Sequence, residues 1–240
     1  MTKEIREYSV RESPRAKSVR LKMSPRDGLV VVVPRGFDVS RIPALLDKKR
    51  DWLERAAAKV EEWRKLLVLE SPDWLPERIA LRAIGREWVV EYRPTAAPWV
   101  AASDRKGDRL LVYGDVGDRE KCRDALRRWV GRKAHEHLVP WLERLAADGG
   151  FQVNRILVKT QRTRWASCSQ RHTISINRKL LFVPGRLTRY IFIHELCHTV
   201  HLNHSRRFWA LVRDQEPNYK PLEEELRQAW RTLPAWLGTR

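Results

Sequence analysis

Eleven consecutive residues place the strongest constraint on how this chain folds. Residues 194–204 read His-Glu-Leu-Cys-His-Thr-Val-His-Leu-Asn-His and hold four of the seven histidines. On an α-helix, His194 and His198 lie about 40° apart around the axis, so their imidazoles can converge on one metal ion. Glu195 lies about 60° from His198, near enough to reach a water molecule on that metal without ligating it. The segment therefore predicts a helix with two zinc ligands and a general base.

A catalytic zinc site needs a third protein ligand and keeps one position open for water. His201 lies on the same helix face but about 10 Å along the axis from His194, which is too far for one ion. His204 is the better candidate, because a turn near Asn203 can bring it back, and Asn tolerates the left-handed backbone such a turn needs. Three downstream carboxylates are the alternative third ligands: Glu223, Glu224 and Glu225.

The charge balance predicts attraction to polyanions. The chain has 48 Lys and Arg against 30 Asp and Glu, a formal net charge of +18. Residues 149–194 contain no acidic residue. Nine basic residues occur in the same stretch: Arg155, Lys159, Arg162, Arg164, Arg171, Arg178, Lys179, Arg186 and Arg189. They are interpreted either as a solvated basic face or as a surface that binds nucleic acid or nucleotides.

Other features narrow the class of protein. Apolar residues make up 42% of the 240, which is enough to bury a core. The longest aliphatic run, residues 29–33, is far shorter than the roughly 20 residues that span a bilayer. The N-terminus is charged from its third residue, and three cysteines are too few and too uneven for a disulfide framework. We therefore expect a cytoplasmic protein without a membrane partner.

The apolar patterning predicts an α+β chain of two domains. Residues 1–117 form the first, which is rich in β-strands. A hairpin at about residues 19–33 precedes one long helix over about residues 40–67. Strands resume after a linker at residues 70–76, where Ser, Pro and Asp break the helix.

Residues 118–240 form the second domain, which contains the histidine motif. A long helix is expected over about residues 119–147, followed by short strands around residues 153–159 and 173–176. The remainder, from about Leu187, is predicted to be helical. This is the predicted catalytic domain.

The motif and its flanks resemble a known family. Residues 194–209, which read HELCHTVHLNHSRRFW, resemble the HELxHxxxxxHSxxFW signature of the YgjP-like metallopeptidase family, which is related to the SprT-like zinc proteases. Residues 164–169, Arg-Trp-Ala-Ser-Cys-Ser, resemble that family's RWGSCS segment, with Ala166 in place of the usual Gly. The likeness extends weakly to the N-terminal β region and so covers most of the chain.

The resemblance implies a zincin-like catalytic domain with an HExxH helix and one zinc per chain. Its ligands would be His194, His198 and His204, and Glu195 would be the general base. It also implies that residues 164–169 lie close to the site.

Four further residues are candidates for binding the substrate or an anion. Arg162, Arg164 and Arg171 flank the segment that the resemblance places beside the metal. Tyr219 is a candidate hydrogen-bond donor to an oxyanion, with core packing as its alternative role.

Three functions agree with these features, in decreasing order of preference. The first is a zinc-dependent metallopeptidase that hydrolyses peptide bonds with a zinc-bound water, with nucleic-acid-associated proteins as one class of substrate. The second is a zinc-dependent hydrolase of nucleotides or other phosphate esters, which the nine cations before the motif would suit. The third is a nucleic-acid-binding protein with structural zinc, although a closed structural site needs no glutamate at position 195.

Overall fold

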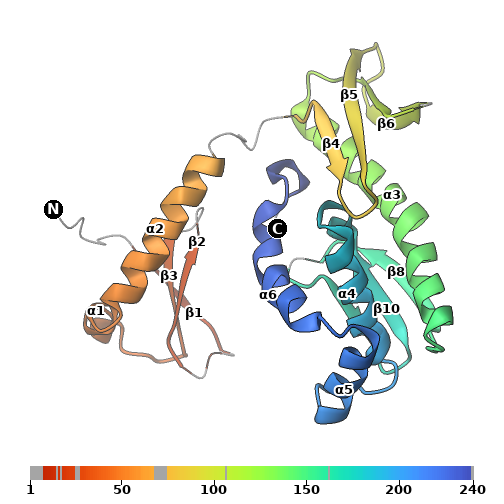
Figure 1. Ribbon diagram of the computed structural model, residues 1–240. Helices are drawn as coiled ribbons and strands as arrows, with labels where there is room; N and C mark the ends of the chain where they lie inside the picture. The colour runs from red at the N-terminus through yellow and green to blue at the C-terminus, as the bar shows by residue number, and fades with distance from the viewer. Residues whose placement is uncertain are drawn as a thin grey trace. The chain divides into compact units, whose positions relative to one another are not determined.

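The computed structural model of the protein describes residues 8–14, 16, 18–24, 28–67, 75–105, 107–161 and 163–238. The chain forms two compact units, residues 1–71 and 72–240 (Figure 1). Most of the expected linker lies outside the described residues. Among the described residues, no helix combines the length and the apolarity that a membrane span requires.

The first unit contains a three-stranded sheet. Its central strand, β3 (Gly28–Val33), pairs antiparallel with β2 (Arg20–Ser24), which is the predicted strand pair. On its other side β3 pairs parallel with β1 (Tyr8–Glu12), a strand that we did not predict. The buried side chains of Val31 and Val33 pack with Ile42 in a small core.

The helix expected over about residues 40–67 is divided in the structure. Three helical segments occupy this region: η1 (Val39–Arg41), α1 (Ile42–Asp47) and α2 (Arg50–Leu67). Between α1 and α2, the Lys49 N–H donates to the Leu46 carbonyl, three residues back, at 3.0 Å. This tighter turn ends the α-helical hydrogen-bond pattern before it resumes in α2.

The second unit begins with a four-stranded sheet of order β4-β5-β7-β6. Its strands are β4 (Arg78–Leu81), β5 (Arg86–Pro94), β6 (Val100–Arg105) and β7 (Arg109–Gly114). Alternate residues along β4 and β5 are buried, as expected for a sheet with one covered face. The cover is α3 (Arg119–Asp148), which Asp118 caps by accepting a hydrogen bond from the Lys121 N–H at 3.1 Å.

A second, three-stranded sheet follows α3. Its central strand β10 (Thr173–Asn177) pairs parallel with β8 (Arg155–Lys159) and antiparallel with β9 (Ala166–Cys168). The strand β9, which we did not predict, lies at the edge of this sheet. The rest of the unit is helical: η2 (Arg178–Phe182), α4 (Gly185–Cys197), α5 (Arg206–Gln215), α6 (Tyr219–Ala229), η3 (Trp230–Thr232) and η4 (Ala235–Leu237).

One continuous core joins the two sheets of the second unit. Figure 1 shows α3 as the long green helix that runs alongside both of them. The fully buried rings of Trp88 and Trp129 pack edge to face across the boundary expected between residues 117 and 118, with centroids 5.3 Å apart. The compact units therefore divide at residue 71 rather than at residue 117, because the four-stranded sheet buries its apolar face on α3.

Candidate metal centre

Helix α4 positions the first part of the histidine motif. The helix begins after Pro184, and apolar side chains anchor it in the core: Leu187, Ile191, Phe192 and Leu196. His194 and Glu195 lie in its last turn, and His198 is its C-cap. The core thus fixes the helix end from which both histidines project.

A tight turn after α4 brings the third histidine back. The His201 N–H donates to the Cys197 carbonyl, four residues back, at 2.9 Å, so one more turn follows the last residue of α4. Ser205 then caps α5 by accepting a hydrogen bond from the Phe208 N–H at 3.4 Å. His204, which immediately precedes this cap, is thereby returned to the end of α4.

The structure brings His194, His198 and His204 together. One ring nitrogen from each lies within 4.8 Å of the others, and the Nε2 atoms of His194 and His204 are 3.1 Å apart. Two nitrogens bound to one tetrahedral ion at about 2.0–2.1 Å are about 3.3 Å apart. The donor set and its spacing therefore fit a single metal ion, with one coordination position left for a non-protein ligand.

The three alternative carboxylates do not join this cluster. They are held by arginines instead: Glu223 and Glu224 by Arg227, at 3.5 and 2.8 Å, and Glu225 by Arg186, at 2.6 Å. The geometry therefore favours His204 over a downstream glutamate.

The backbone of His201 orients one of the three rings. His198 Nδ1 lies 3.0 Å from the His201 carbonyl oxygen, to which it donates when it carries the ring proton. That hydrogen bond leaves the lone pair of Nε2 free for a metal. The His201 side chain is not part of the three-histidine cluster, and nothing in the sequence marked its carbonyl group.

Phe208 packs against all three rings and is fully buried. It stacks on His198 at a centroid distance of 4.4 Å and 26°. Its centroid is 5.0 Å from that of His194 and 4.8 Å from that of His204. This single side chain restricts the rotamers of the whole cluster.

Two further aromatic rings extend the cluster outwards. Trp209 stacks on His204 at 5.6 Å and 27°, and Tyr219 stacks on Trp209 at 5.4 Å and 21°. These contacts agree with the packing role considered for Tyr219. They also place it one ring away from the histidines.

Burial lowers the pKa of two of the three imidazoles. Burial, with electrostatic repulsion from His198 and His204, lowers the pKa of His194 to about 3. Burial also lowers the pKa of His198. Because a metal ligand must be deprotonated, these two side chains are ready to bind a cation at neutral pH.

Glu195 is buried beside the cluster, with 7% of its surface exposed. Burial raises its pKa to about 7, against the opposing effects of a hydrogen bond from the Cys168 backbone and the charge of Arg164. The resulting carboxylate is poised between its two protonation states near neutral pH.

The hydrogen bond to Glu195 comes from the outer edge of β9. Two backbone hydrogen bonds lie at the ends of the paired segment of β9 and β10. The Ser169 N–H donates to the Thr173 carbonyl at one end, and the Asn177 N–H donates to the Trp165 carbonyl at the other. Because antiparallel pairs alternate, the N–H of Cys168 points away from β10. Residues 164–169 therefore lie beside the cluster.

Asn177 holds the chain that leads into β9. Its buried amide donates to the carbonyls of Gln161, at 2.8 Å, and Arg164, at 2.9 Å. Its Oδ1 atom accepts the Lys179 N–H at 3.1 Å. Sequence analysis missed this role, because an Asn after a strand reads first as a turn residue.

Replacement of Asn177 by Ala is expected to lower the free energy of unfolding by about 2–4 kcal/mol, because three backbone groups lose their partners. Urea denaturation measures the change. Asn154→Ala is the matched control, since the exposed Asn154 amide makes one bond, to the Arg171 carbonyl at 2.9 Å. Equal effects of the two substitutions would contradict the anchoring role of Asn177.

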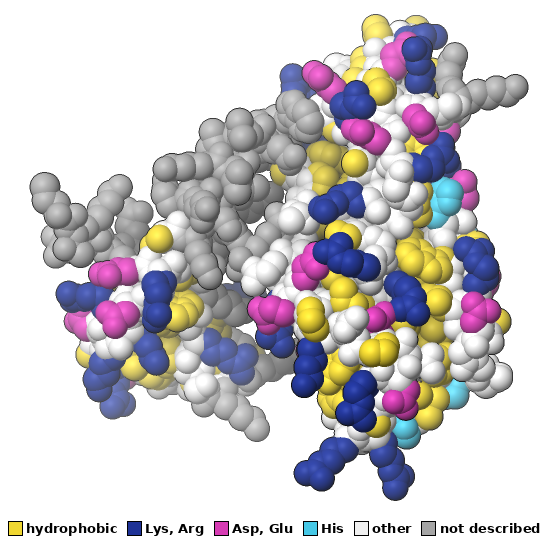
Figure 2. Space-filling model, in the orientation of Figure 1, with side chains coloured by type: hydrophobic (Ala, Val, Ile, Leu, Met, Phe, Trp, Pro, Cys, Tyr) yellow, Lys and Arg dark blue, Asp and Glu magenta, His cyan; other side chains and the backbone are white. Residues whose placement is uncertain are grey.

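The nine cations of the acid-free stretch do not form one surface. Four of them are buried or engaged: Arg178 donates to the Arg127 carbonyl at 2.9 Å, Lys179 is 2% exposed, Arg186 pairs with Glu225, and Arg189 pairs with Glu216. On the face drawn in Figure 2, Lys and Arg side chains are dispersed and Asp and Glu lie among them. The basic stretch lacks acidic residues in the sequence because its carboxylate partners, Glu216 and Glu225, come later in the chain.

The two candidate arginines that the structure describes are separated as well. Arg164 and Arg171 are exposed and lie before and after β9, at opposite ends of that strand. Arg162 lies outside the described residues. Of the three, Arg164 has an established neighbour in the site, because its charge acts on Glu195.

Comparison with known proteins shows a similarity to one protein family and to a solved structure. The family model "YgjP-like, metallopeptidase domain" matches residues 17–229. Among solved structures, the metallopeptidase zymogen abylysin of Pyrococcus abyssi matches with 26% identity and a TM-score of 0.34, over 36% of this chain and 89% of that chain. A comparison with curated proteins found no match.

Proposed function

The chain belongs to the YgjP-like metallopeptidase family, and on that premise we propose that it is a zinc-dependent peptidase. One observation carries the proposal: three imidazoles converge within 4.8 Å beside a buried carboxylate, that of Glu195. Three protein ligands with a carboxylate outside the coordination shell are typical of catalytic zinc, whereas structural zinc is closed by four.

The chemistry of the neighbouring cysteine supports an open coordination position. Cys197 is fully buried, and burial raises the pKa of its thiol to about 12. A protonated, buried thiol packs as a small apolar group and is a poor metal ligand. His194, His198 and His204 would therefore hold the zinc without a fourth protein ligand.

The mechanism assigns acid–base chemistry to Glu195. When bound, zinc would supply activation of a water molecule and polarisation of the substrate carbonyl. Glu195 accepts the proton from that water on a carboxylate oxygen and later donates it to the leaving amine. The Cys168 N–H and the charge of Arg164 orient the carboxylate for both transfers.

The edge of β9 favours a peptide over a phosphate ester. No described strand pairs with this edge, where the N–H and C=O groups of Ala166 and the C=O of Cys168 point outwards. An extended peptide can add to such an edge through main-chain hydrogen bonds, directly beside Glu195. Among the described residues, the cations of the acid-free stretch are dispersed and do not form a comparable site for phosphate.

We place the protein in the cytoplasm as part of the same proposal. All three cysteines are free, and two of them, Cys122 and Cys197, are buried. Free, buried thiols are typical of proteins from reducing compartments.

Zinc removal provides the direct test. The purified protein with one equivalent of zinc is expected to cleave casein, to lose this activity with a chelator, and to regain it when zinc is restored. Nucleoside triphosphates and a DNA-linked protein, incubated in parallel, test the phosphate-ester and nucleic-acid-associated alternatives. Release of phosphate without cleavage of casein would overturn the peptidase proposal.

A further inference from the structure

A cavity of about 370 Å³ opens beside the metal centre and is lined from α5 and α6. Its lining residues are Trp209, Tyr219, Lys220, Glu223 and Arg227. We propose that this cavity binds a large aromatic side chain of the peptide substrate, next to the bond that is cleaved. The inference rests on the proposed peptidase function and names the substrates that this site prefers.

The cavity is connected to the metal ligands by stacked rings. Trp209 forms part of its wall and at the same time stacks on His204, at 5.6 Å, and lies 5.9 Å from the ring of His194. One ring thus separates the cavity from two ligands. We therefore assign a side chain bound there to a substrate residue near the scissile bond.

The wall offers two planar rings in parallel. Tyr219 and Trp209 are stacked at 21°, so both are already held without a ligand. Little rotamer entropy is lost when another ring packs on them, because their orientation is fixed by the neighbouring histidine. Burial of one large apolar side chain on such a surface favours it over alanine by about 10- to 50-fold.

The charged groups at the cavity contribute less. Arg227 is paired with Glu223 and Glu224, so its charge is largely offset. Lys220 is exposed and makes no ion pair with the residues that the structure describes. A new ion pair at an exposed position changes affinity by at most about fivefold. The aromatic rings therefore decide which side chain the cavity prefers.

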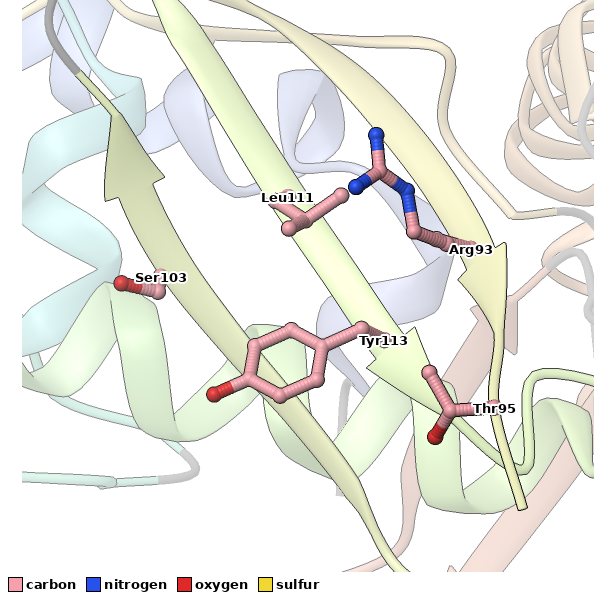
Figure 3. A pocket seen from close by; sticks show the side chains of 5 residues that line it. All are labelled: Arg93, Thr95, Ser103, Leu111 and Tyr113. Atoms are coloured by element: carbon pink, nitrogen blue, oxygen red, sulfur yellow. The ribbon is translucent and has the colours of Figure 1, made fainter. Parts of the chain in front are cut away.

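A second cavity provides a matched control. It has about 340 Å³, lies on the outer face of the four-stranded sheet, and is lined by Arg93, Thr95, Ser103, Leu111 and Tyr113 (Figure 3). Tyr113 contacts Trp99 edge to face at 5.8 Å, whereas Tyr219 is stacked on Trp209 at 5.4 Å. No ring contact joins this cavity to the histidine cluster within the described chain.

Two hydroxamates test the proposal by binding rather than by turnover. N-acetyl-phenylalanine hydroxamate and N-acetyl-alanine hydroxamate chelate zinc through the same group, so the side chain is presented at one defined place. With the zinc-loaded protein, calorimetry is expected to give about tenfold tighter binding of the phenylalanine compound. Tyr219→Ala should reduce this preference below about threefold, whereas Tyr219→Phe and Tyr113→Ala should retain it.

The outcomes distinguish failure of the aromatic cavity from failure of the metal site. Equal affinity for the two hydroxamates, or a preference that Tyr219→Ala leaves intact, would overturn the aromatic cavity while the zinc site stands. Failure of both compounds to bind the zinc-loaded protein would overturn the metal site, and with it the cavity's role. The affinities of the two hydroxamates for the unsubstituted protein already test the proposal. It can therefore be contradicted even if the Tyr219→Ala variant misfolds.

Discussion

Replacement of Glu195 by Gln is expected to lower kcat/KM for peptide hydrolysis by about a thousandfold, within the range that a general acid–base contributes. The amide retains the size of the carboxylate and can still accept the Cys168 N–H, so the local structure should persist. It cannot take a proton from water. Assays with a fluorogenic peptide derived from a mapped casein cleavage site measure the loss, and elemental analysis measures the zinc.

Glu91→Gln is the matched control for this substitution. Glu91 lies on the outer face of the four-stranded sheet, where it pairs with Arg93 at 2.7 Å. Its replacement should change neither zinc content nor kcat/KM. Undiminished turnover by the Glu195→Gln variant would remove Glu195 from the mechanism.

Loss of any one histidine of the cluster is expected to lower zinc content from about one to below about 0.1 per chain after dialysis. Structural zinc sites bind with about 10–16 kcal/mol, so one ligand of four accounts for about 3 kcal/mol, or more than a hundredfold in affinity. The variants are His194→Ala, His198→Ala and His204→Ala. Competition with a chromogenic chelator measures each affinity.

His201→Ala tests the specificity of that result. The His201 side chain is outside the cluster, and its contribution to His198 comes from a carbonyl that alanine retains. We therefore expect full zinc content in this variant. If His204→Ala kept zinc and Glu223→Ala lost it, the third ligand would be a downstream glutamate.

Sequence analysis predicted the elements that are determined by residues close together in the sequence. Asp118 and Ser205 cap helices through their side chains, and a capping side chain is visible in sequence. The strands β2 and β3 follow one another along the chain and pair antiparallel. The histidine spacing indicated which three imidazoles can meet, because helical periodicity is itself local.

The features that were missed depend on distant contacts. The strand β1 pairs in parallel with β3, although β2 separates the two strands in the sequence. The strand β9 has three residues, too few for a periodic pattern. The sequence pattern placed the domain boundary at residue 117. It could not show that the four-stranded sheet packs on α3, because that contact joins residues far apart in the sequence. In the site, the Cys168 N–H and the His201 carbonyl are backbone groups that any residue would provide.

The short stretch that carries all three histidines has a consequence for chain entropy. Closing a loop of about ten residues costs about 2 kcal/mol, roughly half the cost for a loop of a hundred residues. An ion bound by residues 194–204 thus ties together segments that are already neighbours along the chain, and it constrains the unfolded chain only slightly. The two sheets are held by the apolar core around α3, which contains no histidine ligand. A metal ion held only by these histidines would therefore be a late addition to an assembled protein.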